Sequence, residues 1–222
     1  MKVIITIQPL FSDCVVTECC RVEEKEYELY PEERVFIQNA VAKRRREFGA
    51  GRLCARNALA RLGINKYPLC KGDDGVPVWP DGIIGVISHS HNWCGAAVAK
   101  KNDLCALGLD IETIDRVSMR IAKKVLTPVE MKWVNASDKE AQKRLALLFS
   151  AKETVFKCVA SLYGKRLGFY DMVITHVTEE QSFEVKLNEK ISAEIPHCSP
   201  LSGRYLMHEG EVFTGMVLSQ VD

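Results

Sequence analysis

The 222-residue sequence has no C-x-x-C pair, no long apolar run and almost no net charge. Its nine cysteines are odd in number and irregularly spaced, which argues against a disulfide framework, and the adjacent Cys19 and Cys20 suit neither an ordinary disulfide nor a zinc site. No apolar run approaches the roughly 20 residues that a membrane span needs, and the apolar run at Met1–Gln8 is too short for a signal peptide. We therefore expect a cytoplasmic protein with free thiols and no membrane partner.

The formal net charge of +1 provides no overall field for a polyanion, so we expect no nucleic-acid partner. Locally, residues 43–61 carry seven basic side chains and one acid. This run has three interpretations: a nucleic-acid patch, a solvated helix face or a phosphate clamp. In a helix, Arg44 and Arg52 are about two turns apart and can face one anion from the same side. Lys71, in a loop rich in Gly and Asp, can serve the same anion.

The composition, 47% hydrophobic and 27% charged, is typical of a globular chain that buries one core or two closely packed halves. Apolar patterns predict strands at 3–7, 83–87, 95–99, 104–112, 172–177, 181–187, 203–207 and 211–218. Helical patterns run over 31–48, with interruptions at Gly49 and Gly51, over 53–62, from Thr127 onward and over 144–162. Helices precede strands on each side of residue 105, which is compatible with a duplicated α/β body.

Asp110 and Glu112 alternate with apolar residues in a predicted strand. Residues two apart on a strand share a face and lie about 6.5–7 Å apart along the chain. Two carboxylates presented in this way can hold one hard divalent cation. The alternative is a solvated strand face, which carries acids without any ligand.

Glu153 and Lys157 are four residues apart in a predicted helix and share one face. One interpretation is an ordinary amphipathic helix with a surface ion pair. The other makes Glu153 a third carboxylate beside Asp110 and Glu112. Three acids around one Mg²⁺, with Lys152 and Lys157 nearby, describe a site for a pyrophosphate-bearing substrate, because Mg²⁺ completes its octahedron with water and phosphate oxygens.

Ser88 and His89 follow an apolar strand, where α/β proteins tend to place ligands, and can bind a phosphate or satisfy the backbone of a turn. A serine hydrolase is not indicated, because no G-x-S-x-G nucleophile elbow occurs. His89, His91 and Cys94 do not match a standard zinc spacing and lack a fourth ligand. The Asp-Asp-Gly at residues 73–75 lacks the spacing of a calcium loop.

These motifs, in their order along the chain, resemble those of the 4′-phosphopantetheinyl transferases. The resemblance spans about residues 40–175 and is to the larger, pseudo-dimeric type that includes the enterobactin-synthase component. The matching residues are Arg44, Arg52-x-Cys54-Ala55-Arg56, Lys71-Gly72-x-x-Gly75-x-Pro77-x-Trp79-Pro80, Ser88-His89, Gly108-x-Asp110-Ile111-Glu112 and Phe149-Ser150-Ala151-Lys152-Glu153-x-x-Phe156-Lys157.

The resemblance implies an α+β fold of two pseudo-symmetric subdomains, with the active site between them. Each subdomain would pack helices on a small, mainly antiparallel sheet. Residues 1–105 would contact the adenylate and 3′-phosphate of coenzyme A (CoA), and residues 106–222 would carry the metal-binding acids and the Lys-Glu helix.

The resemblance also implies the reaction: the 4′-phosphopantetheine arm of CoA moves to a serine of an apo acyl or peptidyl carrier protein, releasing adenosine 3′,5′-bisphosphate. Asp110, Glu112 and Glu153 would hold Mg²⁺, or Mn²⁺, on the CoA pyrophosphate. The implied CoA-binding residues are Arg44, Arg52, Lys71, Gly75, Pro77, Ser88, His89, Lys152 and Lys157. Lys152 and Lys157 would also neutralise the pyrophosphate and the charge that develops on the leaving group. Glu153 would accept the serine proton, with Asp110 or a metal-bound water as the alternative base.

The carrier is not specified by the sequence: siderophore, other nonribosomal-peptide, polyketide and fatty-acid carriers all fit. Residues 113–120 and 164–170 are the expected docking segments, with apolar Val117 and Met119 suited to a helix-in-groove contact. We expect a monomer. Two alternative functions are a metal-dependent nuclease, which would usually place a lysine two residues after Glu112 where this chain has Ile114, and a non-catalytic CoA-binding module.

Overall fold

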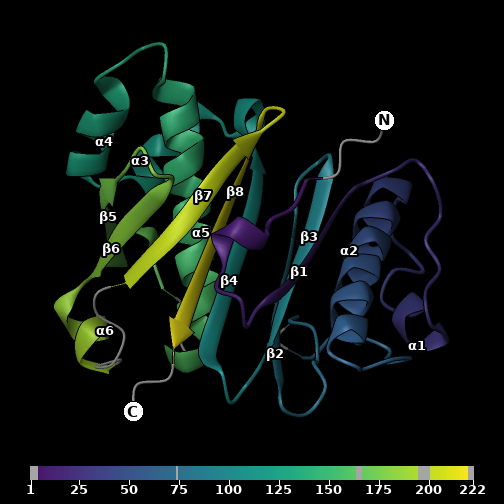
Figure 1. The fold of residues 1–222 in the computed structure, drawn as a ribbon. Helices are drawn as coiled ribbons and strands as arrows, with labels where there is room; N and C mark the ends of the chain where they lie inside the picture. Colours follow the sequence, from purple (N-terminus) through teal and green to yellow (C-terminus); the bar gives the residue numbers. More distant parts are fainter. Residues whose placement is uncertain (1–4, 74, 164–166, 195–200, 220–222) are drawn as a thin grey trace.

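The structure, a computed structural model, describes residues 5–73, 75–163, 167–194 and 201–219. Two antiparallel sheets stand next to each other, and one long helix covers a face of each (Figure 1). Helix α2 packs on the three-stranded sheet, whose order is β1-β3-β2, and helix α5 packs on the five-stranded sheet, whose order is β4-β8-β7-β6-β5. This arrangement confirms the predicted α+β class.

The strands are β1 (Val16–Arg21), β2 (Ile83–His89), β3 (Trp93–Lys100), β4 (Leu104–Thr113), β5 (Met172–Val177), β6 (Ser182–Leu187), β7 (Leu201–His208) and β8 (Glu211–Ser219). The α-helices are α1 (Pro31–Arg34), α2 (Ala42–Arg61), α3 (Ala122–Val125), α4 (Pro128–Asn135), α5 (Ala141–Tyr163) and α6 (Glu189–Glu194). Short 3-10 helices occur at Gln8–Leu10, Ile114–Arg116, Met119–Ile121 and Phe169–Asp171.

The glycines at 49 and 51 lie inside one continuous helix, so the predicted interruption of α2 is wrong. An added Cβ at Gly49 would overlap the Tyr27 side chain, and one at Gly51 would lie 3.1 Å from a methyl group of Ile87. These glycines therefore let the helix approach its neighbours closely, at the cost of about 1 kcal/mol each in intrinsic helix propensity. The helix predicted from residue 31 is also shorter than expected, because α1 ends at Arg34 and α2 begins at Ala42.

The N-terminal segment differs from the prediction as well. Described residues 5–7 form no strand, and Ile7 is instead a buried residue of a core cluster that takes side chains from both sheets. The strand at Val16–Arg21 was not predicted, because only Thr17 is fully buried in it and its apolar alternation is weak. The later strands were predicted to within two residues at each end, since β5 to β7 show alternating burial and β8 is a nearly continuous buried run.

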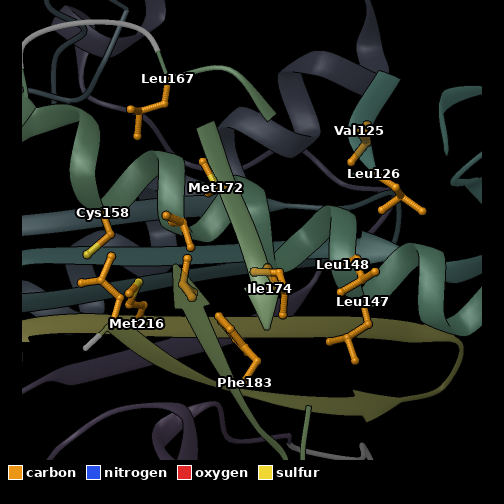
Figure 2. Close-up of a cluster of buried hydrophobic side chains, with 14 of the residues drawn as sticks. Val125, Leu126, Leu147, Leu148, Cys158, Leu167, Met172, Ile174, Phe183 and Met216 are labelled. Carbon is orange, nitrogen blue, oxygen red and sulfur yellow. The ribbon is translucent and has the colours of Figure 1, made fainter. Parts of the chain in front are cut away.

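The larger core lies between α5 and the five-stranded sheet. Figure 2 shows Leu148 of α5 packed near Ile174 of β5 and Phe183 of β6, with Met216 of β8 along the same sheet. At Gly108 of β4, an added Cβ would overlap the carbonyl oxygen of Thr154. This close approach fixes the position of α5 against the strand that carries Asp110 and Glu112.

Within the described ranges, the structure contains no helix with both the length and the apolar character of a membrane span. None of the eight cysteines in this part of the chain is joined by a disulfide. The predicted division into residues 1–105 and 106–222 stays a prediction.

Candidate active site

Three polar side chains meet where β2 lies beside β4. The Lys157 ammonium, on α5, donates to Asp110 Oδ1 at 2.6 Å and to Ser88 Oγ at 3.0 Å. The Ser88 hydroxyl donates to the same Asp110 oxygen at 3.1 Å. The structure thus brings together three predicted site residues, one from each sheet and one from α5, while their role in binding stays a prediction.

The second carboxylate oxygen of Asp110 is available to a ligand. Asp110 is 3% exposed, and its Oδ2 is buried without a hydrogen-bond donor among the described groups. Leaving a buried carboxylate oxygen unpaired is costly, about 1–3 kcal/mol or more. A cation with oxygen ligands would satisfy this atom.

Glu112 and Glu153 lie close enough to Asp110 to feel its charge. Burial, and next the Asp110 charge, raise the pKa of Glu112 to about 8. The same two causes raise the pKa of Glu153, and the Lys157 ammonium opposes them. Carboxyl groups that lie close together in a half-buried site resist ionisation until a cation compensates their negative charge.

The donor set fits a hard divalent cation, since carboxylate oxygens are the ligands that Mg²⁺ takes in proteins. In the part of the chain that the structure describes, however, no group of three or more His, Cys, Asp or Glu side chains stands in an arrangement that would hold a metal ion. Lys157, which occupies Asp110 Oδ1, compensates part of the negative charge in this arrangement. Holding one ion between the three acids therefore requires a change of side-chain positions.

Arg44 and His89 converge from α2 and β2. Arg44 Nη1 lies 2.9 Å from His89 Nε2, and Glu47 Oε2 lies 3.9 Å from both Arg44 Nη1 and His89 Nδ1. Burial lowers the pKa of His89, and the Glu47 carboxylate acts against that change. A neutral imidazole accepts a hydrogen bond at Nε2, so the Arg44 guanidinium provides the fixed positive charge of this group.

Arg52 lies deeper than Arg44, with 5% of its surface exposed. Its guanidinium carbon stacks 4.1 Å from the centre of the Phe48 ring. Burial lowers the pKa of Arg52 to about 10, which leaves it cationic at neutral pH. Its Nε is buried and has no acceptor among the described groups. An anionic ligand would supply the missing acceptor.

The loop that follows Lys71 closes on itself. An isolated β-bridge joins Lys71 to Pro77, and Gly75 has φ of +87°, a left-handed conformation that glycine adopts without strain. Gly75 and Pro77 line a pocket of about 1130 Å³ that also borders Glu153 and Lys157. Apolar residues form much of the remaining lining, among them Trp79, Ile84, Phe156, Leu167 and Phe169.

The predicted CoA contact of Lys152 does not fit the position of its ammonium in the structure. Lys152 is fully buried, and its Nζ donates to Glu130 Oε2 at 2.7 Å and to the carbonyl oxygens of Val125 and Phe169 at 2.8 and 2.9 Å. Glu130 in turn accepts from the backbone N–H of Thr127 and of Ile174. Lys152 therefore joins α5 to its neighbouring elements, and its three acceptors leave no donor for a ligand.

The expected docking segments are also changed. Val117 is buried in the core, so it is not available for a helix-in-groove contact, whereas Met119 is 44% exposed. Residues 164–166 of the second segment lie outside the described residues. Tyr170 of that segment is exposed, and its hydroxyl donates to the carbonyl oxygen of Lys123.

Two acids near the site were not predicted. Glu47 lies against Arg44 and His89, and its signal was its place as the single acid in a basic run. Glu211 is fully buried at the start of β8 and adds to the negative charge that raises the pKa of Glu112. The sequence gives no signal for Glu211, because the pairing of β8 with β4 brings together residues almost 100 positions apart.

Comparisons with known families agree with this arrangement. Residues 32–99 match the model of the 4′-phosphopantetheinyl transferase N-terminal domain, and residues 106–207 match that of the 4′-phosphopantetheinyl transferase superfamily. The first match contains the residues contributed by α2 and β2, and the second contains the acids and Lys157.

Relatives with curated names extend the similarity over most of the chain. The 4′-phosphopantetheinyl transferase PptT of Mycobacterium tuberculosis is 34% identical over 193 residues, which cover 85% of each protein. The transferase Svp of Streptomyces mobaraensis is 38% identical over 161 residues, 72% of this chain and 65% of that protein. Enterobactin synthase component D of Escherichia coli K12 is 33% identical over 155 residues, 69% of this chain and 72% of that protein.

Proposed function

The chain belongs to the 4′-phosphopantetheinyl transferase family, and we propose that it moves the 4′-phosphopantetheine arm of CoA to a serine of an apo carrier protein, with adenosine 3′,5′-bisphosphate as the second product. The observation that carries the proposal is the hydrogen-bonded triangle of Ser88, Asp110 and Lys157. It joins the two sheets next to Glu112 and Glu153, which supports a site where phosphate groups and a metal ion would bind side by side.

Mg²⁺, or Mn²⁺ in its place, would be held by Asp110, Glu112 and Glu153, and it would neutralise the pyrophosphate oxygens when bound. The unpaired Oδ2 of Asp110 supports this assignment. So does the raised pKa of both glutamates, because burial, and next the Asp110 charge, disfavour their ionised forms, which a bound cation would favour.

The 3′-phosphate and adenylate end of CoA would lie against the first sheet. Arg44 and the unpaired Nε of Arg52 offer donors there, and Lys71 would add a mobile charge from its loop. Ser88 and His89, at the end of β2, would bind between this end and the pyrophosphate. Gly75 and Pro77 border the pocket that continues toward Glu153, so they would shape the path of the ligand.

In the transfer step, the serine oxygen of the carrier bonds to the phosphorus that bears the pantetheine arm. The bond from that phosphorus to the bridging oxygen breaks, and adenosine 3′,5′-bisphosphate leaves with the electron pair. Lys157 compensates the charge that develops on the leaving group, since phosphoryl transfer depends mainly on positioning and electrostatics. Glu153, whose pKa is raised by burial and by Asp110, accepts the serine proton. Asp110 is the alternative acceptor.

The carrier would be an acyl or peptidyl carrier protein of siderophore, other nonribosomal-peptide, polyketide or fatty-acid synthesis. The similarity to enterobactin synthase component D supports a siderophore carrier as the first to test. A monomeric, cytoplasmic enzyme is part of the proposal, and light scattering of the purified chain would test the oligomeric state.

Product analysis tests the chemistry. With CoA, an apo carrier and Mg²⁺, chromatography should show adenosine 3′,5′-bisphosphate formed in equal amount to the CoA consumed. Chelation should stop the reaction, and Mg²⁺ or Mn²⁺ should restore it. CoA binding without product, with or without metal, would instead support the binding module, and divalent-dependent cleavage of DNA would support the nuclease.

A further inference from the structure

Glu211 is a buried carboxylate to which the proposed reaction assigns no part. It is fully buried at the first position of β8. The Thr113 hydroxyl lies 3.0 Å from each of its oxygens, and Asn92 Nδ2 donates to Oε1 at 2.9 Å. These partners are neutral, so the network provides hydrogen bonds in exchange for the water that the carboxylate loses on burial.

The two partners of Glu211 belong to different sheets. Thr113 directly follows Glu112 on β4 and is paired with Glu211 across the five-stranded sheet. Asn92 belongs to the turn between β2 and β3 of the three-stranded sheet, three residues after His89. One side chain therefore connects the end of the strand that carries the acids to the turn that follows Ser88 and His89.

The turn that contains Asn92 is itself well ordered by hydrogen bonds. The Ser90 hydroxyl accepts from the backbone N–H of Asn92 and of Trp93, and the Ser90 N–H donates to the Trp93 carbonyl oxygen at 2.8 Å. The Asn92 carbonyl oxygen accepts from the Val22 N–H at 2.8 Å. Because these hydrogen bonds hold the shape of the turn, a contact that holds Asn92 in place also holds the adjacent end of β2.

We infer that Glu211 is a positioning residue that holds the β2–β3 turn at a set distance from the end of β4, and so sets the spacing between Ser88 and His89 on one side and Asp110 and Glu112 on the other. The inference rests on the proposed function for its consequence, since CoA would bridge these two groups. A ligand that spans two rigid segments binds well only when their spacing matches it, so loss of the connection weakens CoA binding before it slows the chemical step.

Asn92→Ala is the main test, because it removes the cross-sheet hydrogen bond and leaves the carboxylate and Thr113 in place. We expect the KM for CoA, and its Kd by calorimetry, to rise about tenfold. This is the lower end of the loss usually seen when a residue that orients the binding residues is removed. The kcat at saturating CoA should change less than twofold. Glu211→Ala should raise KM and Kd by at least as much, since it also removes a negative charge that acts on Glu112. The double variant should be no worse than the more impaired single variant, since both changes remove one connection.

Two further variants separate positioning from other roles. Glu211→Gln keeps an acceptor for Asn92 and a hydrogen-bonding group for Thr113, so it should retain most of the CoA affinity. Glu209→Gln removes an exposed ion pair to Arg21 on the adjacent turn, and it should leave both KM and kcat unchanged. If Glu211→Ala fails to fold, Asn92→Ala, at a partly exposed turn, decides the question.

A folded Asn92→Ala protein with the KM and Kd of the wild type would overturn the inference, as would equal losses in Asn92→Ala and Glu209→Gln. Failure of the proposed function has a different signature. In that case the wild-type protein itself would give no transfer to the carrier, whereas failure of the positioning role leaves wild-type transfer intact.

Discussion

At the scale of single residues, adjacent lysine and glutamate side chains of α5 have different surroundings. Helix geometry places Glu153 and Lys157, four apart, on one face, and this pairing was predictable. Lys152 is one position before Glu153, about 100° around the helix, and it points to Glu130 instead. Lys152 was predicted to be a site residue because it belongs to the motif at residues 149–157. Helical periodicity alone places it on a different face from Glu153.

Substitutions of the two lysines should therefore have different effects. Lys152→Met leaves the buried Glu130 carboxylate without its cation, and breaking a buried pair on one side costs about 3–5 kcal/mol. We expect the free energy of unfolding in urea to fall by about 3 kcal/mol, with CoA affinity of the folded protein unchanged. Lys157→Met should reduce CoA affinity and leave the free energy of unfolding little changed. A Lys152→Met protein of normal stability that has lost CoA binding would restore the original prediction.

The raised pKa of Glu112 has a consequence for stability. Burial and Asp110 move this pKa from its ordinary value of 4.5 to about 8, so the folded chain keeps a proton that the unfolded chain releases. The stability that this proton provides is complete below about pH 4.5 and is lost as the pH rises through 8. Glu112→Gln keeps a neutral side chain at every pH.

In metal-free buffer, Glu112→Gln should therefore be close to the wild type in stability at pH 5 and more stable at pH 8.5, by urea unfolding at both values. The exposed Glu32→Gln is the matched control and should show no pH-dependent difference. A difference between Glu112→Gln and wild type that does not change with pH would contradict the raised pKa.

At the scale of elements, the strands of the second half were predictable and the first helices were not. Strands β5 to β7 show alternating burial and β8 is a nearly continuous buried run, and both patterns indicate strands. Between α1 and α2, apolar Val35, Phe36 and Val41 are 56%, 40% and 73% exposed, so apolar spacing there does not report a buried helix face. The predicted interruption at Gly49 and Gly51 is wrong because the packing of other side chains against these glycines cannot be seen in the sequence.

The contact of α5 with β4 at Gly108 should be sensitive to one methyl group. An added Cβ would overlap the carbonyl oxygen of Thr154, a backbone atom that cannot rotate away. Gly108→Ala should reduce the free energy of unfolding by about 1–3 kcal/mol. Because α5 carries Glu153 and Lys157, transfer should fall as well. Cys105→Ala, at an exposed position of the same strand, should change neither quantity; equal stability of the two variants would contradict the close approach.

At the scale of the whole molecule, the site exists only because two sheets meet. Ser88 belongs to the three-stranded sheet, Asp110 to the five-stranded sheet, and Lys157 to the helix behind the latter (Figure 1). Local patterns located each segment, and the family resemblance implied that they converge. Neither indicated the cross-sheet contact at Asn92 and Glu211, because such contacts depend on three-dimensional register rather than on sequence spacing.

The most direct measurement is the intact mass of an apo siderophore carrier protein after incubation with this chain, CoA and Mg²⁺. Wild-type protein should increase the carrier mass by one phosphopantetheine arm, on a serine that peptide mapping locates. Folded Asp110→Ala protein should leave the carrier unchanged, because it loses the carboxylate shared by Ser88 and Lys157. No mass gain in siderophore, other nonribosomal-peptide, polyketide and fatty-acid carriers with the wild type would contradict the proposed chemistry. An undiminished gain with Asp110→Ala would contradict the proposed site.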